Sequence, residues 1–105
     1  MKFPRKITVA GKPIQVFYDK STADSEYDGM KRTITIGTKG DKSADKLDSF
    51  LHETFEAITH LRGVCYERPL IEGDIGNDDC IYVITHDELN VVISDLAVVV
   101  GNLLK

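Results

Sequence analysis

The sequence predicts an α+β domain with a small, mostly antiparallel sheet, made of a β-hairpin and one or two further strands, and with two main helices. Three observations carry this prediction. Residues 6–37 show the short apolar runs and glycine-containing turns of strands. Residues 43–62 repeat apolar positions at helical spacing, and residues 89–103 do the same. At 105 residues the chain is long enough for one modest core, so we expect a single domain over residues 1–105.

The predicted strands begin with a hairpin. Lys6–Val9 and Ile14–Tyr18 flank residues 10–13, whose glycine and proline indicate a turn. Asp28-Gly29 indicates a second turn. Thr33–Gly37 then alternates with period two, which is typical of a strand with one buried face.

The first predicted helix runs from Ser43 to Arg62, with Asp41 or Ser43 as its N-cap and Gly63 as its stop. His52, Glu56 and His60 fall on the side away from the centre of its apolar stripe. That side either faces water or is covered by a second element, with a site formed between the two. The stripe itself consists of Leu47, Phe50, Leu51, Phe55, Ile58 and Leu61.

The last predicted helix follows the short strand-like run Ile81–Ile84. Thr85 and Glu88 fit a capping box, in which each satisfies a backbone N–H group at the helix start. Its apolar surface extends almost all round, so we expect it to be buried on most sides or paired with another copy of itself. The apolar positions are Leu89, Val91, Val92, Ile93, Leu96, Ala97, Val98, Val99, Val100 and Leu103. The core candidates of the whole chain are Ile7, Val9, Val16, Ile34, Ile36, Leu51, Phe55, Ile58, Val92, Leu96 and Val99.

Val64 to Asp79 reads as a polar, turn-rich loop with one short strand around Leu70-Ile71, acting as a lid or only as a connection. The acidic residues from 74 to 79 do not match the spacing of a calcium-binding EF-hand loop, which favours a solvated loop. Cys65 and Cys80 lack the paired spacing of a thiolate zinc site. In a reducing compartment we expect both to be free thiols, whereas export would allow a disulfide.

Charge and hydropathy exclude some classes of binding partner. The formal net charge is −4 and the pI about 5.3, so the chain lacks the basic footprint of a nucleic-acid-binding protein. No apolar stretch follows the first six residues, as a secretory signal requires. The longest apolar run, Leu96–Val100, is far shorter than a membrane span. We therefore expect a cytoplasmic protein that binds neither nucleic acid nor membranes.

The polar side of the first helix suggests a metal site. His52 and Glu56 stand four residues apart, so they project from one face and are able to hold one ion, with Glu53 beside it as a general base. This is the layout of the zinc-hydrolase motif HExxH with its second His replaced by Glu. The competing interpretation is an ordinary solvated helix face. His60 lies two turns from His52 and cannot easily share its ion, so we expect it to be a surface residue or to support the site.

His86 is the predicted third ligand. It lies in the first turn of the last helix, where the helix dipole disfavours imidazolium and keeps the ring neutral, fit to bind a metal. If the two helices pack together, His86 approaches His52 and Glu56 and gives two imidazoles and a carboxylate, a set that suits catalytic Zn²⁺. Glu53 would then accept a proton from the metal-bound water. Alternatively, the His86 ring simply faces solvent.

The segment Phe50–Ile58, with the pattern LHExxEAI, resembles that of a group of small phage and prophage proteins. Those proteins open with a β-hairpin and end in a helix preceded by a His, as in Thr85-His86-Asp87-Glu88-Leu89. They are similar in turn to minimal zincin metallopeptidases. The resemblance covers roughly residues 6–104 and implies a zincin-like core, metal ligands His52, Glu56 and His86, and Glu53 as base.

Three functions are consistent with the sequence. The first is a small zinc-dependent, peptidase-like hydrolase acting on a peptide or protein. The second is a metal-binding phage module without catalysis, serving a structural or regulatory role with a phage or host protein. The third is a metal-free interaction domain that forms a homodimer, or docks on a partner, through the apolar C-terminal helix.

Overall fold

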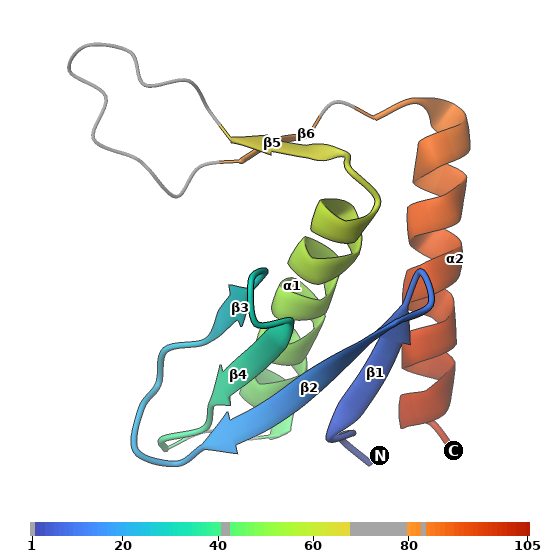
Figure 1. The fold of residues 1–105 in the computed structure, drawn as a ribbon. Coiled ribbons are helices and arrows are strands. Elements are labelled where there is room, and N and C mark those ends of the chain that lie inside the picture. Colours follow the sequence, from blue (N-terminus) through green and yellow to red (C-terminus); the bar gives the residue numbers. More distant parts are fainter. Residues whose placement is uncertain (1, 41–42, 68–79, 83) are drawn as a thin grey trace, which may run out of the picture.

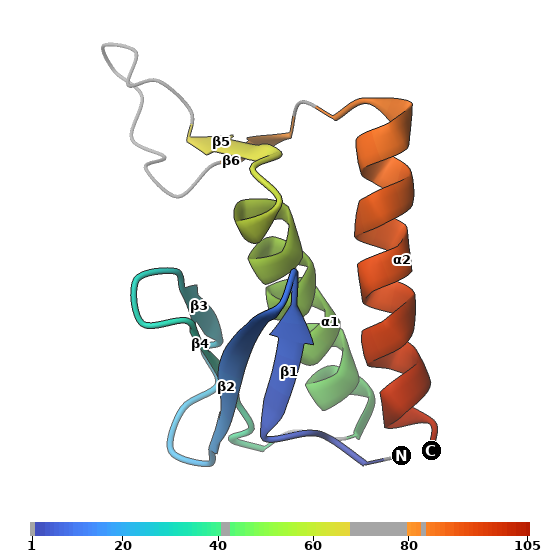
Figure 2. The same ribbon diagram turned by 45° about the vertical axis from the view of Figure 1, so that its right-hand side comes forward.

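The computed structural model describes residues 2–40, 43–67, 80–82 and 84–105. A four-stranded sheet in the order β1-β2-β4-β3 lies against α1, and α2 lies beside α1 on the β1 side (Figures 1 and 2). A second, two-stranded sheet pairs β5 with β6. This is the predicted α+β fold with two main helices. In chain order the elements are β1 (Lys6–Val9), β2 (Lys12–Asp19), β3 (Glu26–Asp28), β4 (Thr33–Gly37), α1 (Ser43–Leu61), β5 (Cys65–Glu67), β6 (Cys80–Tyr82) and α2 (His86–Leu103).

The predicted hairpin is confirmed as β1 and β2. Its turn consists of Ala10 and Gly11, both with positive φ (52° and 76°), and Val9 pairs with Lys12 across it. Two left-handed residues match the twist of the flanking strands, as in the type I′ turns that favour two-residue hairpins. Ile7, Val9, Ile14 and Val16 point to the buried face and their polar neighbours are exposed, whereas Phe17 is exposed on the opposite face.

The strand predicted at Thr33–Gly37 is confirmed as β4, and it pairs with β2 in parallel, from Gln15 opposite Thr33 to Asp19 opposite Gly37. The sequence did not indicate β3, a three-residue strand that pairs antiparallel with β4 and forms an edge of the sheet. Because β3 runs back along the sheet, β4 can re-enter between β2 and β3 with the same direction as β2. Two of the three strand pairings in the four-stranded sheet are therefore antiparallel.

Helix α1 packs against the rest of the fold through two faces, whereas the sequence predicted a single apolar stripe. Phe50, Ala57 and Ile58 are fully buried. Leu51 and Phe55, which were expected in the core, are half-buried and pack against its margin. This split arises because α1 contacts both the sheet and α2. Among the described residues, the buried core contains Ile7, Val9, Ile14, Val16, Ile34, Ile36, Phe50, Ala57, Ile58, Val64, Val92, Val99 and Leu103.

The predicted end of α1 is confirmed. The helix stops at Leu61, and Gly63 has φ +72° while its N–H group donates to the carbonyl of His60. Left-handed glycine is the usual way to satisfy the last carbonyls of a helix. The proposed caps at Asp41 and Ser43 lie outside the side chains that the structure describes.

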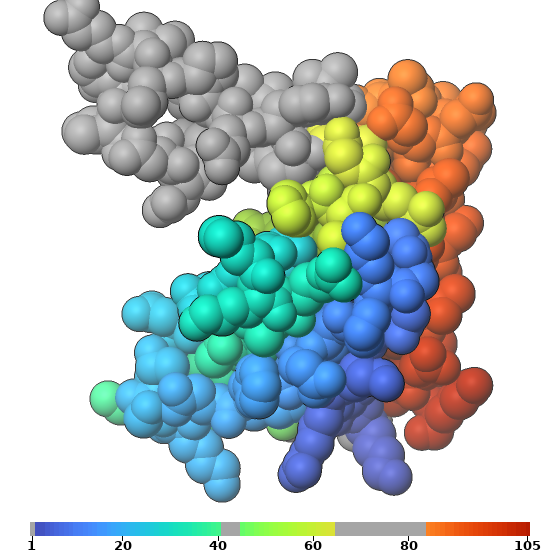
Figure 3. Space-filling view, in the orientation of Figure 1, coloured from blue at the N-terminus to red at the C-terminus, as the bar shows by residue number. Residues whose placement is uncertain are grey.

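Helix α2 begins at the predicted capping box. The Thr85 hydroxyl accepts from the Glu88 N–H group, and the Glu88 carboxylate accepts from the Thr85 N–H group. Val92, Val99 and Leu103 are buried, so only one side of the helix packs on the other described residues, and Figure 3 shows the helix along one edge of the molecule. The expectation that α2 is buried on most sides is therefore wrong for a single chain. The physical reason is that α2 lies at the margin of the fold, with α1 as its main neighbour (Figure 2).

The segment after α1 differs from the predicted loop. Its first residues form β5, which pairs with β6, and β6 confirms the strand-like character of the run beginning at Ile81. The register sets Cys65 opposite Tyr82 and Cys80 opposite Glu67. The predicted strand at Leu70-Ile71 and the acidic residues 74–79 lie outside the described residues. Within the described residues, no helix is long and apolar enough to cross a membrane.

We expect Gly37→Ala to destabilise the protein by roughly 2–4 kcal/mol, as overpacking against a rigid neighbour does. A Cβ at Gly37 would lie 2.5 Å from the backbone of Ala23 and Asp24, which cannot move without disturbing the β2–β3 connection. Urea unfolding followed by circular dichroism measures this difference. Gly29→Ala is the matched control, since the three atoms nearest to its new Cβ all belong to the His60 ring and none to the backbone, so a side chain can shift at the cost of its hydrogen bond with Tyr27. Equal losses in both variants would contradict the prediction.

Candidate functional site

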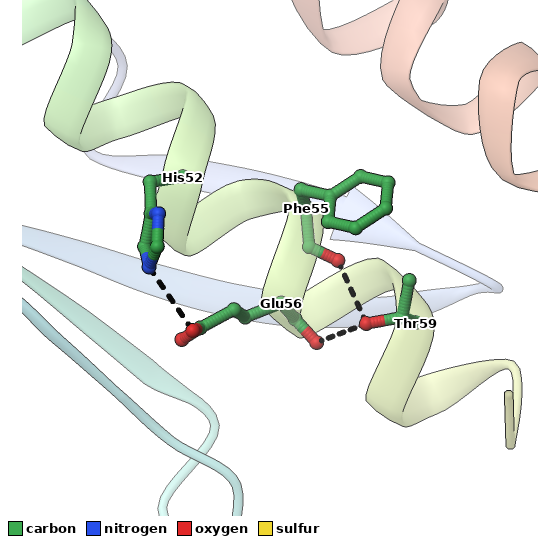
Figure 4. Close-up of polar contacts among 4 residues, drawn as sticks. All are labelled: His52, Phe55, Glu56 and Thr59. Carbon is green, nitrogen blue, oxygen red and sulfur yellow. Dashed lines mark hydrogen bonds and ion pairs between the residues drawn. The ribbon is translucent and has the colours of Figure 1, made fainter. Parts of the chain in front are cut away.

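His52 and Glu56 form the exposed half of the candidate site on α1. The i, i+4 spacing places both side chains on one face, and His52 Nε2 lies 3.1 Å from Glu56 Oε1 (Figure 4). One turn further on, the Thr59 hydroxyl donates to the carbonyls of Phe55 and Glu56, so this buried polar group is satisfied inside the helix. The expected pairing of His52 with Glu56 is thus present in the structure.

Glu53 is the buried half of the site, with only 5% of its surface exposed. Its Oε2 atom is buried and has no hydrogen-bond partner among the described residues. The pKa of Glu53 is raised to about 7, chiefly by burial and then by the negative charge of Glu56 and a side-chain hydrogen bond with it. A buried carboxyl group with an orphaned oxygen is costly unless a proton or a cation neutralises it.

The three side chains form a group that could hold a metal ion. His52, Glu53 and Glu56 each offer one ligand atom, and these atoms lie within 4.8 Å of one another. Imidazole nitrogen and carboxylate oxygen are ligands of zinc and of other divalent transition metals. The orphaned oxygen of Glu53 fits this chemistry, because a cation would satisfy it and would also relieve the repulsion between the two carboxylates.

The edge strand β3 brings further polar groups to α1. The Tyr27 hydroxyl and His60 Nδ1 share a 3.0 Å hydrogen bond, and their rings pack edge to face. Glu26 also contributes to the raised pKa of Glu53. Glu26 and Tyr27 were not among the predicted site residues, because the sequence did not indicate β3. The sequence feature that could have indicated β3 is the aromatic residue just before the Asp28-Gly29 turn, since a strand is expected on both sides of such a turn.

His60 supports the fold and is not part of the candidate metal group. Its Nδ1 is engaged by Tyr27, and its ring lies over Gly29, where no Cβ intervenes. This agrees with the expectation that His60 does not share an ion with His52. The contact ties β3 to the last turns of α1.

The structure does not bring His86 to His52 and Glu56. The two helices run in opposite directions, so the N-terminus of α2 lies near the C-terminal end of α1 (Figures 1 and 2). Leu96 is the α2 residue that lines a cavity with His52. His86 stands ten residues before Leu96, about 15 Å along the helix axis, and its exposed ring approaches only Asn90. The predicted third ligand is therefore absent from the group that the described residues form.

A cavity of ≈ 480 Å³ adjoins the site on the α2 side. His52, Glu56 and Asp48 lie at its polar margin, and the half-buried residues Leu51 and Phe55 with Leu96 of α2 give it an apolar lining. An apolar hollow with a few polar groups at one side is the usual form of a small-molecule or side-chain binding site.

No family model matches the chain, and neither a curated protein nor a solved structure matches it significantly.

We expect the free energy of unfolding of the metal-free protein to fall as the pH rises from about 5 to about 8. Folding raises the pKa of Glu53 from 4.5 to about 7, so the folded state holds a proton that the unfolded state has released. This stabilisation is complete below 4.5 and is lost as the pH passes 7. The whole difference corresponds to roughly 3 kcal/mol, but solvent screens the partly exposed Glu56, and we expect roughly 1–2 kcal/mol.

Urea unfolding in the presence of a chelator, at three pH values across this window, measures the slope. Glu53→Gln is the control, because its amide does not titrate and its stability should change less over the same range. A wild-type stability that rises through the window would contradict the assigned environment of Glu53.

Proposed function

We propose that this protein binds one divalent metal ion, Zn²⁺ in the simplest case, and acts as a small metal-dependent hydrolase of the peptidase type. His52 and Glu56 hold the ion, and Glu53 stands next to it as the general base. The observation that carries the proposal is the buried Glu53 carboxyl group, with an unsatisfied oxygen, in contact with a second carboxylate. Such a pair needs a proton or a cation between its members.

The environment of Glu53 suits a base. In the metal-free protein the pKa of Glu53 is about 7, and a cation bound beside it would lower that pKa and leave the carboxylate ionised near neutral pH, ready to accept a proton. A zinc ion bound by two or three protein ligands keeps at least one position open for water and makes that water acidic. The adjoining apolar cavity is able to hold an apolar group of the substrate next to that water.

A second function is supported by the composition of the group. It contains a single imidazole, because Glu56 replaces the second His of the zincin motif and His86 lies elsewhere. A site with two carboxylates and one His holds a metal without necessarily reproducing zincin chemistry. A metal-binding phage module without hydrolysis is therefore the alternative, and the resemblance to phage and prophage proteins is compatible with both.

Equilibrium dialysis against Zn²⁺, followed by elemental analysis, tests metal binding. We expect one ion per chain, removed by a chelator, and chelator-sensitive cleavage of a mixture of peptides with apolar side chains. Stoichiometric zinc without any cleavage would favour the non-catalytic alternative. Failure to bind zinc or any other divalent transition metal at neutral pH would contradict both functions.

A further inference from the structure

Helix α2 presents an uncharged face to solvent on the side away from the core. Small residues follow one line along this face at helical spacing, and all of them are exposed: Asn90, Ser94, Ala97 and Gly101. Large apolar side chains flank the line, with Leu89, Ile93 and Leu104 on one side and Val91 and Val98 on the other, each between 41% and 71% exposed. We call these nine residues the outer face of α2.

The outer face holds most of the large apolar residues that the fold leaves in water. Of the seven that are exposed among the described residues, five belong to α2 or to its C-cap. Contiguous apolar surface of this kind marks interaction sites on soluble proteins. Since α1 contacts the opposite, buried side of α2, an occupant of the outer face has to come from outside this chain's described part.

Gly101 indicates that the partner's backbone comes close to α2 at this position. A Cβ at Gly101 would meet nothing within 4 Å, so no neighbour within the described chain requires a glycine there. A glycine inside a helix weakens it relative to alanine. A second helix that crosses at Gly101 and Ala97 gains from the missing side chains, because its backbone can come nearer while the flanking Leu, Ile and Val residues interlock.

The charges near the two ends of α2 indicate which partner fits the outer face, and in which orientation. Asp87 and Glu88 lie in its first turn, and the helix contains no Lys or Arg. Two Lys residues lie near the other end: Lys105 follows the helix, and Lys2 is held beside it, because its N–H group donates to the carbonyl of Leu103. The two termini lie side by side in Figure 1. A second copy in antiparallel orientation sets the acidic end of one α2 against the basic end of the other. Opposed helix dipoles favour the same orientation.

We propose that two copies of this chain associate through an antiparallel contact between their outer faces of α2. The contact is isologous and closed by a two-fold axis, so each copy uses the same residues. The proposal does not depend on a metal, because none of the nine residues belongs to the candidate metal group.

Sedimentation equilibrium in reducing buffer with a chelator tests the proposal, because these conditions exclude disulfide-linked and metal-linked dimers. We expect the wild type to be a dimer, and the double variant with Ile93→Glu and Val98→Glu to be a monomer with an unchanged circular dichroism spectrum. Met30→Glu is the matched control, since Met30 is 98% exposed and lies outside α2. A monomeric wild type, or a double variant that remains a dimer, would overturn the proposal.

Two further variants keep the test decisive if the double variant unfolds. Gly101→Leu has open space in the single chain, so it should fold and yet raise the dimer dissociation constant at least about tenfold by blocking close approach. Asp87→Lys should raise it by roughly two- to fivefold, and adding Lys105→Glu should restore it. Unchanged dimerisation in Gly101→Leu, or no rescue in the charge swap, counts against the antiparallel contact.

Discussion

His52→Ala is expected to lower the affinity for Zn²⁺ at least about 100-fold. Loss of a residue that merely supports a ligand costs about 10- to 100-fold, so loss of the single imidazole in the group should cost more. Because the His52 side chain is largely exposed and only its pairing with Glu56 is lost, the fold should not suffer. Competition with a chromophoric chelator measures the affinity directly.

His86→Ala and His60→Ala are the controls for this prediction. The structure places both rings outside the group, with His86 beside Asn90 and His60 bonded to Tyr27. Both variants should therefore bind zinc as the wild type does. A loss in His86→Ala comparable to that in His52→Ala would mean that α2 moves by more than a turn when metal binds, and that the zincin-type ligand set forms after all.

The fold was predictable where local chemistry determines it. Turn residues, period-two strands, the glycine stop at Gly63 and the capping box at Thr85 depend on neighbours in sequence. The elements they define agree with the structure. The parallel pairing of β2 with β4 depends instead on β3, which has three residues and too little periodicity to be recognised.

The candidate site was predictable only in part, for the same reason. His52 and Glu56 meet because of helical geometry, which sequence spacing contains. The burial of Glu53 depends on how α1 turns its faces toward the sheet and α2, and the predicted stripe did not show that Glu53 borders the buried side. The prediction of His86 as a ligand required that the two helices pack with this residue beside His52 and Glu56. The position of His86 depends on the direction of α2 relative to α1, and the spacing of residues in the sequence does not encode that direction.

Helix α2 has more apolar surface than the single chain buries. The sequence required burial on most sides or pairing with another copy, and the structure buries only one side. The remaining surface is the one that the proposed antiparallel dimer would cover. Its nine residues carry no charge, which distinguishes it from the mixed charges of an ordinary solvated helix face.

Glu53→Gln is expected to separate catalysis from metal binding. Glutamine keeps the size of the side chain and the remaining ligands, so zinc affinity should change by less than about tenfold while hydrolysis falls by roughly 10²- to 10⁴-fold, the usual contribution of a general base. Measured side by side, the zinc affinity and the cleavage rate distinguish the base from a third ligand. If zinc is lost together with hydrolysis, Glu53 is a ligand, as its position within 4.8 Å of the other donor atoms permits.

Glu26→Gln is the matched control for this prediction, because Glu26 lies close enough to influence the pKa of Glu53 but does not belong to the metal group. It should retain both zinc and hydrolysis, and removing its negative charge should move the acidic limb of the pH–rate profile to lower pH. Since Glu26 raises the pKa of Glu53, its loss allows Glu53 to ionise, and so to act as a base, at lower pH. A profile that stays fixed in Glu26→Gln would assign that limb to a group other than Glu53.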